Sequence, residues 1–119
     1  MYLQYEKVIE FQKKIGAELP SEPCPVPRNV RHKMVTRLYE EVNEFLNAID
    51  IYEQAHEITD ILYVVLGMFA QIGVSPSELF DAVHYSNMTR DEDAKKGAGY
   101  VDPRPKIEAI VKSYWENES

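Results

Sequence analysis

The chain has 119 residues, of which 45% are hydrophobic and 28% charged, and its formal net charge at pH 7 is −7. This length fits one domain, residues 1–119, with its own core. The acidic balance argues against a nucleic-acid partner. The longest apolar run, residues 61–70, is too short to suggest a membrane partner. A single cysteine and no basic, apolar leader lead us to expect a cytoplasmic protein.

The first half of the chain predicts two helices around a proline-rich loop. Apolar residues recur at helical spacing from about Tyr2 to Ile15, and Gly16 ends the pattern. The stretch LPSEPCPVP holds four of the seven prolines, which is typical of an extended loop. A second apolar stripe runs from about Val30 to Ile49 and predicts an amphipathic helix.

The second half predicts further helices, each with a recognisable start. Asp50 followed by Glu53 forms a capping box that opens a helix reaching about Ile72. The sequence SPSE supplies a cap and a first-turn proline for a fourth helix, which reaches about Asp91. KKGAGYVDPRP reads as a loop before a terminal helix over residues 105–115. No segment reads as a strand, so the fold class is an all-α bundle of four to five helices.

Two acidic pairs interrupt the apolar stripes of the second and third predicted helices. In each pair the acids are three residues apart, so both carboxylates point to one side of the helix: Glu41 with Glu44, and Glu57 with Asp60. The turn near Asp50 is short enough to require an antiparallel hairpin, which places the two pairs level with each other. We therefore expect four carboxylates to converge. Oxygen ligands of this kind suit Mg²⁺ or Mn²⁺.

The cationic residues are concentrated in two short segments. Nine of the thirteen lie there: Arg28, Arg31, Lys33 and Arg37 before the first acidic pair, and Arg90, Lys95, Lys96, Arg104 and Lys106 after the second. They are either ordinary solvated surface or a site for an anionic ligand.

The acidic motif resembles that of a known superfamily. EEVNE, twelve residues and then EITD resemble the E-E-x-x-E … E-x-x-D signature of the all-α NTP pyrophosphatases, the MazG-like superfamily. The resemblance also includes VIEFQKKIG, DILYVVLGMFAQIGV, and VHYSNMTR followed by KGAGYVDP, and so covers nearly the whole chain. It is closest to small members described as dUTPase-like or phosphoribosyl-ATP-pyrophosphohydrolase-like.

This resemblance implies an activity and a set of site residues. The reaction would be Mg²⁺-dependent hydrolysis of a nucleoside triphosphate to monophosphate and pyrophosphate, in nucleotide-pool house-cleaning. Matched positions imply four metal ligands: Glu41, Glu44, Glu57 and Asp60. They imply catalytic roles for Glu40, Glu41 and Glu44, although the helical spacing places Glu40 farthest from the others. Substrate contacts would come from Asn87, Arg90, Lys96 and Tyr100.

Other interpretations of these residues are open. Asn87 is also suited to a helix C-cap. Arg90 and Lys96 are equally suited to be solvated surface charges, and Tyr100 is suited to packing. A di-iron bundle would use Glu53 and His56 of EQAH, but no second Glu-x-x-His is present. A non-catalytic adaptor would instead present the acidic flank to a basic partner.

The sequence ILYVVLGMFAQIGV is apolar on nearly all sides, and such a helix requires burial on most of its faces. We therefore expect a homodimer, with the third helices at an isologous interface and the nucleotide cleft lined by both chains. The family resemblance also implies a homodimer, and some relatives form tetramers.

Overall fold

The computed structural model describes residues 1–116, and these form five helices and no strand. The helices are α1 (Tyr2–Lys14), α2 (Arg28–Leu46), α3 (Ile51–Ile72), α4 (Pro76–Met88) and α5 (Arg104–Glu116). The predicted all-α class is confirmed.

Two helices end earlier than the sequence predicts. α2 stops at Leu46 because the next four residues make the turn into α3, whose cap Asp50 has an extended backbone. α4 stops at Met88 because the Thr89 hydroxyl donates to the carbonyl of Ser86 at 2.6 Å and also accepts from the N–H of Val101 at 2.9 Å. In both places side-chain hydrogen bonds compete with a further helical turn.

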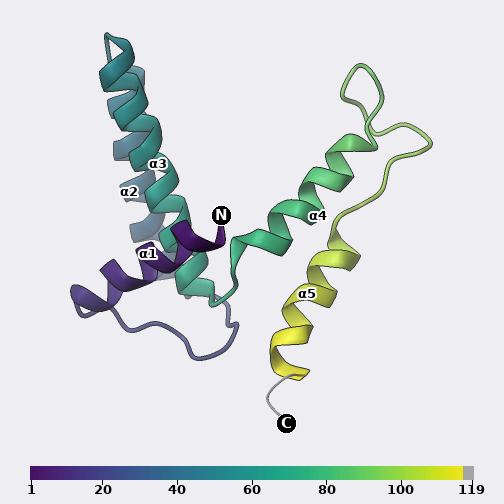
Figure 1. Cartoon of the computed structure of the whole chain (residues 1–119), viewed down its shortest axis with the longest axis horizontal. Helices are drawn as coiled ribbons and strands as arrows, with labels where there is room; N and C mark the ends of the chain where they lie inside the picture. The colour runs from purple at the N-terminus through teal and green to yellow at the C-terminus, as the bar shows by residue number, and fades with distance from the viewer. Residues whose placement is uncertain (117–119) are drawn as a thin grey trace.

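The α2–α3 hairpin is one arm of the molecule (Figure 1). The predicted capping box is present at its turn, with the Glu53 N–H donating to Asp50 Oδ1 at 2.8 Å. The Glu53 carboxylate accepts from the N–H of Ile49 at 3.1 Å, one residue before the cap. This turn holds two long helices antiparallel, so it fixes which side chains of α2 and α3 face each other.

A small core joins α1 to the C-terminal half of α3. Tyr5 and Val8 of α1 pack against Leu66 and Ala70 of α3. Burial in this core raises the pKa of the Tyr5 phenol. α1 therefore crosses α3 at the end of the hairpin remote from the turn, as Figure 1 shows.

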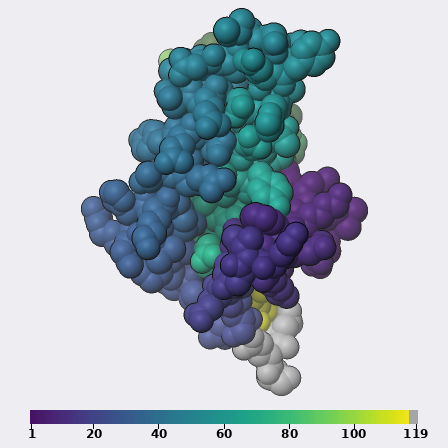
Figure 2. Space-filling view, turned by 90° about the vertical axis from the view of Figure 1, so that its left-hand side faces the viewer, coloured from purple at the N-terminus to yellow at the C-terminus, as the bar shows by residue number. Residues whose placement is uncertain are grey.

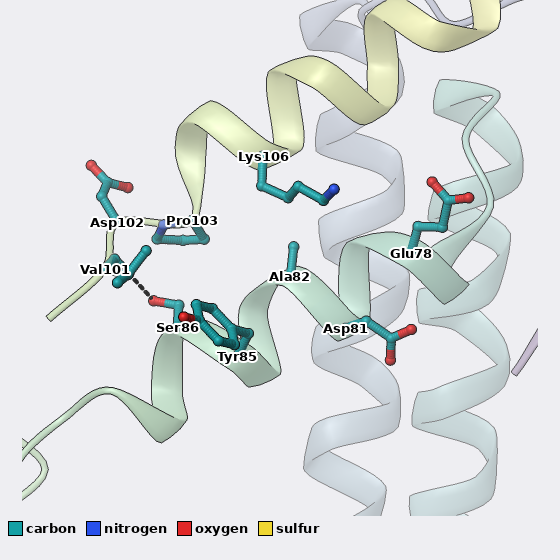
Figure 3. A pocket seen from close by; sticks show the side chains of 9 residues that line it. All are labelled: Glu78, Asp81, Ala82, Tyr85, Ser86, Val101, Asp102, Pro103 and Lys106. Carbon is teal, nitrogen blue, oxygen red and sulfur yellow. Dashed lines mark hydrogen bonds between the residues drawn. The ribbon is translucent and has the colours of Figure 1, made fainter.

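α4 and α5 form a second arm that diverges from the first (Figure 1). The Ser86 hydroxyl donates to the carbonyl of Val101 at 2.7 Å and so holds the loop between them (Figure 3). A cavity of about 540 Å³ separates the two helices, with Tyr85 and Lys106 in its lining. The radius of gyration is 16.6 Å, whereas a compact domain of this length has about 13–14 Å. The chain is thus open rather than closed on itself.

α3 is long and apolar enough, by length and composition, to cross a membrane, with a mean hydropathy of 1.2 over 18 residues. The core helix of a globular protein meets the same condition, so this is weak evidence for a membrane. Within the chain only 17% of that window is buried. The helix therefore lacks most of the cover that its composition requires.

Gly73, which ends α3, offers a test of the fold. Its φ is +75°, and a Cβ there would lie 3.0 Å from the carbonyl oxygen of Glu22. Gly73→Ala should lower the free energy of unfolding by about 2–3 kcal/mol, from left-handed strain plus this clash. Gly16 is a matched control, since its φ is +80° with nothing within 4 Å. Gly16→Ala should cost only about 1 kcal/mol. Equal losses in urea denaturation would show that the contact with Glu22 is unimportant.

Candidate functional site

The four predicted carboxylates converge between α2 and α3. One oxygen from each of them lies within 4.8 Å of the others, and the residues are Glu41, Glu44, Glu57 and Asp60. The convergence predicted from the hairpin is therefore observed. We call these four residues the acidic cluster. That they bind a metal remains a prediction.

Burial makes the acidic cluster unusual. Glu41 is only 8% exposed. Among residues 1–116, Oε2 of Glu41 and Oε2 of Glu57 are both buried without a hydrogen-bond partner. A buried charged oxygen without a partner costs more than the roughly 1–3 kcal/mol of a neutral group. A hard divalent cation takes oxygen ligands of this type, so the donor set fits such an ion.

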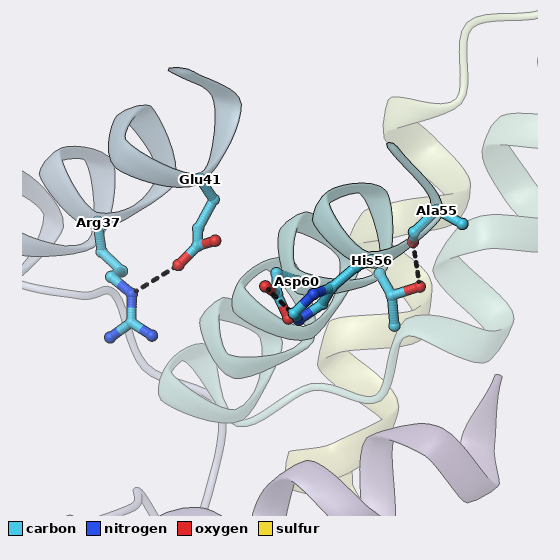
Figure 4. Close-up of polar contacts among 6 residues, drawn as sticks. Arg37, Glu41, Ala55, His56 and Asp60 are labelled. Atoms are coloured by element: carbon cyan, nitrogen blue, oxygen red, sulfur yellow. Dashed lines mark hydrogen bonds and ion pairs between the residues drawn. The ribbon is translucent and has the colours of Figure 1, made fainter. Parts of the chain in front are cut away.

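Two side chains contact carboxylates of the acidic cluster (Figure 4). Arg37 Nε lies 3.3 Å from Glu41 Oε1, with its side chain 64% exposed. His56 Nε2 lies 3.2 Å from Asp60 Oδ2. Arg37 and His56 are each four residues from their partners, so the i, i+4 spacing is the signal by which the sequence places them beside the cluster. Sequence reasoning did not assign either residue to this site.

Glu40 is exposed and lies outside the acidic cluster. This agrees with the helical spacing, which places it toward the opposite face of α2. Its predicted catalytic role therefore has no support from its position in one chain.

The di-iron interpretation does not fit the position of Glu53. The carboxylate of Glu53 caps the turn by accepting from the N–H of Ile49, whereas His56 groups with Glu57 and Asp60. The Glu-x-x-His pair is thus divided between a cap and the acidic cluster. An oxygen-rich site with one exposed histidine favours Mg²⁺ or Mn²⁺ over iron.

The four predicted substrate contacts also come together, at the C-terminal end of α4. Arg90 donates from Nε to Asn87 Oδ1 at 3.2 Å and from a terminal nitrogen to the carbonyl of Ala94 at 2.9 Å. The Arg90 guanidinium and the Lys96 ammonium lie 5.4 and 5.2 Å from the centre of the Tyr100 ring. We call Asn87, Arg90, Lys96 and Tyr100 the cationic group. Asn87 is not a C-cap, since α4 continues to Met88 and Thr89 caps it.

The acidic cluster and the cationic group lie on different arms of the chain. The first is on the α2–α3 hairpin and the second where α4 enters its loop, and Figure 1 shows these two regions well separated. No hydrogen bond or ion pair within residues 1–116 joins them. One chain therefore presents the two halves of the predicted site apart.

An all-helical chain with this acidic motif on a helical hairpin defines a class, the all-α NTP pyrophosphatase superfamily. The chain belongs to the phosphoribosyl-ATP pyrophosphohydrolase family, whose model matches residues 8–87. The match includes the whole acidic cluster, and in the cationic group it includes Asn87 only. The family implies a pyrophosphohydrolase that acts on the acid anhydride of a nucleotide-like substrate. A comparison with curated proteins finds no match.

The metal assignment can be tested without measuring activity. Glu44→Gln removes one charge from the crowded carboxylates, so the metal-free protein should melt at the same temperature or up to about 3 °C higher. Added Mg²⁺ should raise the melting temperature of the parent protein and have less than about half that effect on the variant. Glu40→Gln is the control, because it removes an exposed charge outside the cluster. If Mg²⁺ stabilises Glu44→Gln as strongly as the parent, the ligand assignment is wrong.

Proposed function

We propose that this protein is a Mg²⁺-dependent nucleoside triphosphate pyrophosphohydrolase that removes unwanted nucleotides from the pool. The observation that carries the proposal is the acidic cluster, in which two buried carboxylate oxygens lack partners. Family membership supports release of pyrophosphate from a nucleotide-like substrate. In this proposal residues 1–119 form one cytoplasmic domain that has neither a nucleic-acid nor a membrane partner.

The acidic cluster would hold Mg²⁺, with Mn²⁺ as a substitute. When bound, the ion would neutralise phosphate charge and lower the pKa of a bound water. Glu41 and Glu57 would offer their buried, unpartnered oxygens to the ion, while Glu44, which is exposed, would be accessible to substrate. Arg37, the partner of Glu41, is exposed enough to turn toward a phosphate instead.

The cationic group would bind the outer phosphates. The guanidinium of Arg90 and the ammonium of Lys96 each lie against the ring of Tyr100. Two fixed positive charges would stabilise the charge that develops on departing pyrophosphate. A strong general acid is then unnecessary, and Asn87 positions the guanidinium through its 3.2 Å hydrogen bond.

The open shape supports a homodimer, or a tetramer built from such dimers. A cavity of about 450 Å³ between the two arms is lined only by apolar residues, with Leu62, Phe69 and Leu79 among them. Leu62 is 40% exposed and Phe80 63% exposed in the single chain. A partner covering this surface would bury α3 as its composition requires. In our proposal, the cationic group of one protomer faces the acidic cluster of the other.

A second candidate substrate is phosphoribosyl-ATP, which the family match favours. It carries the same triphosphate as a nucleoside triphosphate, so the acidic cluster and the cationic group would act on it in the same way. A panel that includes phosphoribosyl-ATP and the common ribo- and deoxyribonucleoside triphosphates, with Mg²⁺ and a pyrophosphate readout, separates the two candidates.

The bond that breaks distinguishes this proposal from an ordinary phosphatase. With the preferred substrate, the products should be a monophosphate and pyrophosphate, because the metal-binding carboxylates direct water to the α phosphorus. Hydrolysis in ¹⁸O-labelled water should place the label on the monophosphate, as read by mass spectrometry. Diphosphate and orthophosphate as first products would contradict the proposed reaction even with an intact metal site.

The composite site can be tested by mixing two inactive variants. Asp60→Asn removes an acid and Arg90→Gln removes a cation, so each pure dimer lacks an intact site. After subunit exchange at equal amounts, half of the dimers are mixed, and each mixed dimer has one intact site. Activity should recover to about a quarter of the parent value. If native mass spectrometry shows mixed dimers but activity does not recover, the acidic cluster and the cationic group of a site belong to the same chain.

A further inference from the structure

A third cavity lies where α1, α2 and α3 meet, next to the acidic cluster. Its volume is about 390 Å³. Figure 2 shows the face of the molecule on which these three helices come together. Neither the acidic cluster nor the cationic group contributes a residue to its lining. Its walls combine aromatic rings, side-chain amides and two cations, which is a different composition from that of the apolar cavity between the arms.

Two residues connect this cavity with the acidic cluster. Arg37 lines the cavity and also lies 3.3 Å from Glu41. Tyr63, which also lines the cavity, comes one helical turn after Asp60. From Asp60 to Gly67, another lining residue, the rise along α3 is about 10 Å. A nucleotide spans a distance of that order between its α phosphate and the edge of its base.

Aromatic and amide groups define the interior of the cavity. The rings of Phe11 and Tyr63 meet edge to face, with centroids 5.9 Å apart and planes at 67°. Both rings are partly exposed, at 43% and 41%, so aromatic surface remains for a planar ligand to stack on. Stacking on an aromatic side chain accepts any base, so these rings do not choose among them.

The side-chain amides of Gln12 and Gln71 also line the cavity. Gln71 Nε2 donates to Gln12 Oε1 at 3.4 Å, which is long for such a bond. Within residues 1–116 no other hydrogen bond is made by either amide. The Nε2 donor of Gln12 and the Oε1 acceptor of Gln71 therefore have no partner among the described residues, and both residues line the cavity. A donor and an acceptor in one cavity can complement the hydrogen-bonding edge of a nucleobase.

Gly67 makes room for this arrangement in the middle of α3. It is buried, and a Cβ at this position would lie 3.0 Å from Gln12 Nε2. A glycine inside a helix is unfavourable relative to alanine. Its absent side chain lets the Gln12 amide lie directly on the backbone of α3.

We infer that the cavity between α1, α2 and α3 binds the nucleobase of the substrate. Gln12 and Gln71 read the edge of the base, Phe11 and Tyr63 contact its face, and Gly67 sets the depth. Lys33 and Arg37 at the cavity direct the phosphates toward the acidic cluster. This inference rests on the proposed function, since it assigns a position to one part of the same substrate.

Binding of nucleosides, which carry no phosphate, tests the inference without metal or turnover. Uridine, deoxyuridine, thymidine, cytidine, adenosine and guanosine are each titrated into the metal-free protein, and dissociation constants are measured by saturation-transfer NMR. Gly67→Ala and Gln12→Met should weaken the preferred nucleoside by about tenfold, which corresponds to the loss of one or two hydrogen bonds. Gln4→Met is the control, on an exposed part of α1 remote from the cavity.

The stabilisation by Mg²⁺ should be the same in all three variants, because none of them alters the acidic cluster. A preference for adenosine would assign the cavity to the adenine of phosphoribosyl-ATP or ATP, and a preference for another nucleoside to a different triphosphate. The inference is overturned if no nucleoside binds the parent protein, or if both cavity variants bind as well as Gln4→Met. Failure of the proposed function is seen separately, as absence of pyrophosphate release from every triphosphate.

Discussion

The main physical constraint in this structure is the crowding of four carboxylates at the edge of a helical hairpin. Two short-range features create it, the i, i+3 spacing of the acids in each helix and the turn capped by Asp50. The price is that two buried carboxylate oxygens have no partner within residues 1–116. Such an arrangement opposes folding stability. In the proposed function, a bound divalent cation supplies the opposite charge that offsets this cost.

α3 links the parts of the molecule that bear on function. One side of the helix carries Glu57 and Asp60, another packs on α1 through Leu66, and a third faces the apolar cavity between the arms. Gly67 leaves space for an amide on the remaining side. A helix with so many different neighbours must be apolar around most of its circumference. These contacts account for part of its high hydropathy, and in our proposal a partner subunit covers the apolar surface that remains exposed.

The separation of charge between the two arms has a physical consequence. Further positive groups placed permanently beside the acidic cluster, in addition to Arg37, would neutralise it and compete with a cation for the same oxygens. On the second arm, Arg90 and Lys96 instead share the ring of Tyr100 and remain available to an anion. If a partner subunit brings the two groups together, substrate binding and assembly are coupled, since each site is complete only at the interface.

The amino-acid sequence determined the helices, the capped turn and the acidic cluster, because each depends on spacing within one helix or across one short turn. For that reason the sequence alone predicted that the four carboxylates of the acidic cluster lie together, namely Glu41, Glu44, Glu57 and Asp60. Only the tertiary structure showed how α1 crosses α3, where the arms diverge and which oxygens are buried without partners. These features depend on contacts between residues distant in sequence, such as Gln12 with Gln71, for which helical periodicity contains no information.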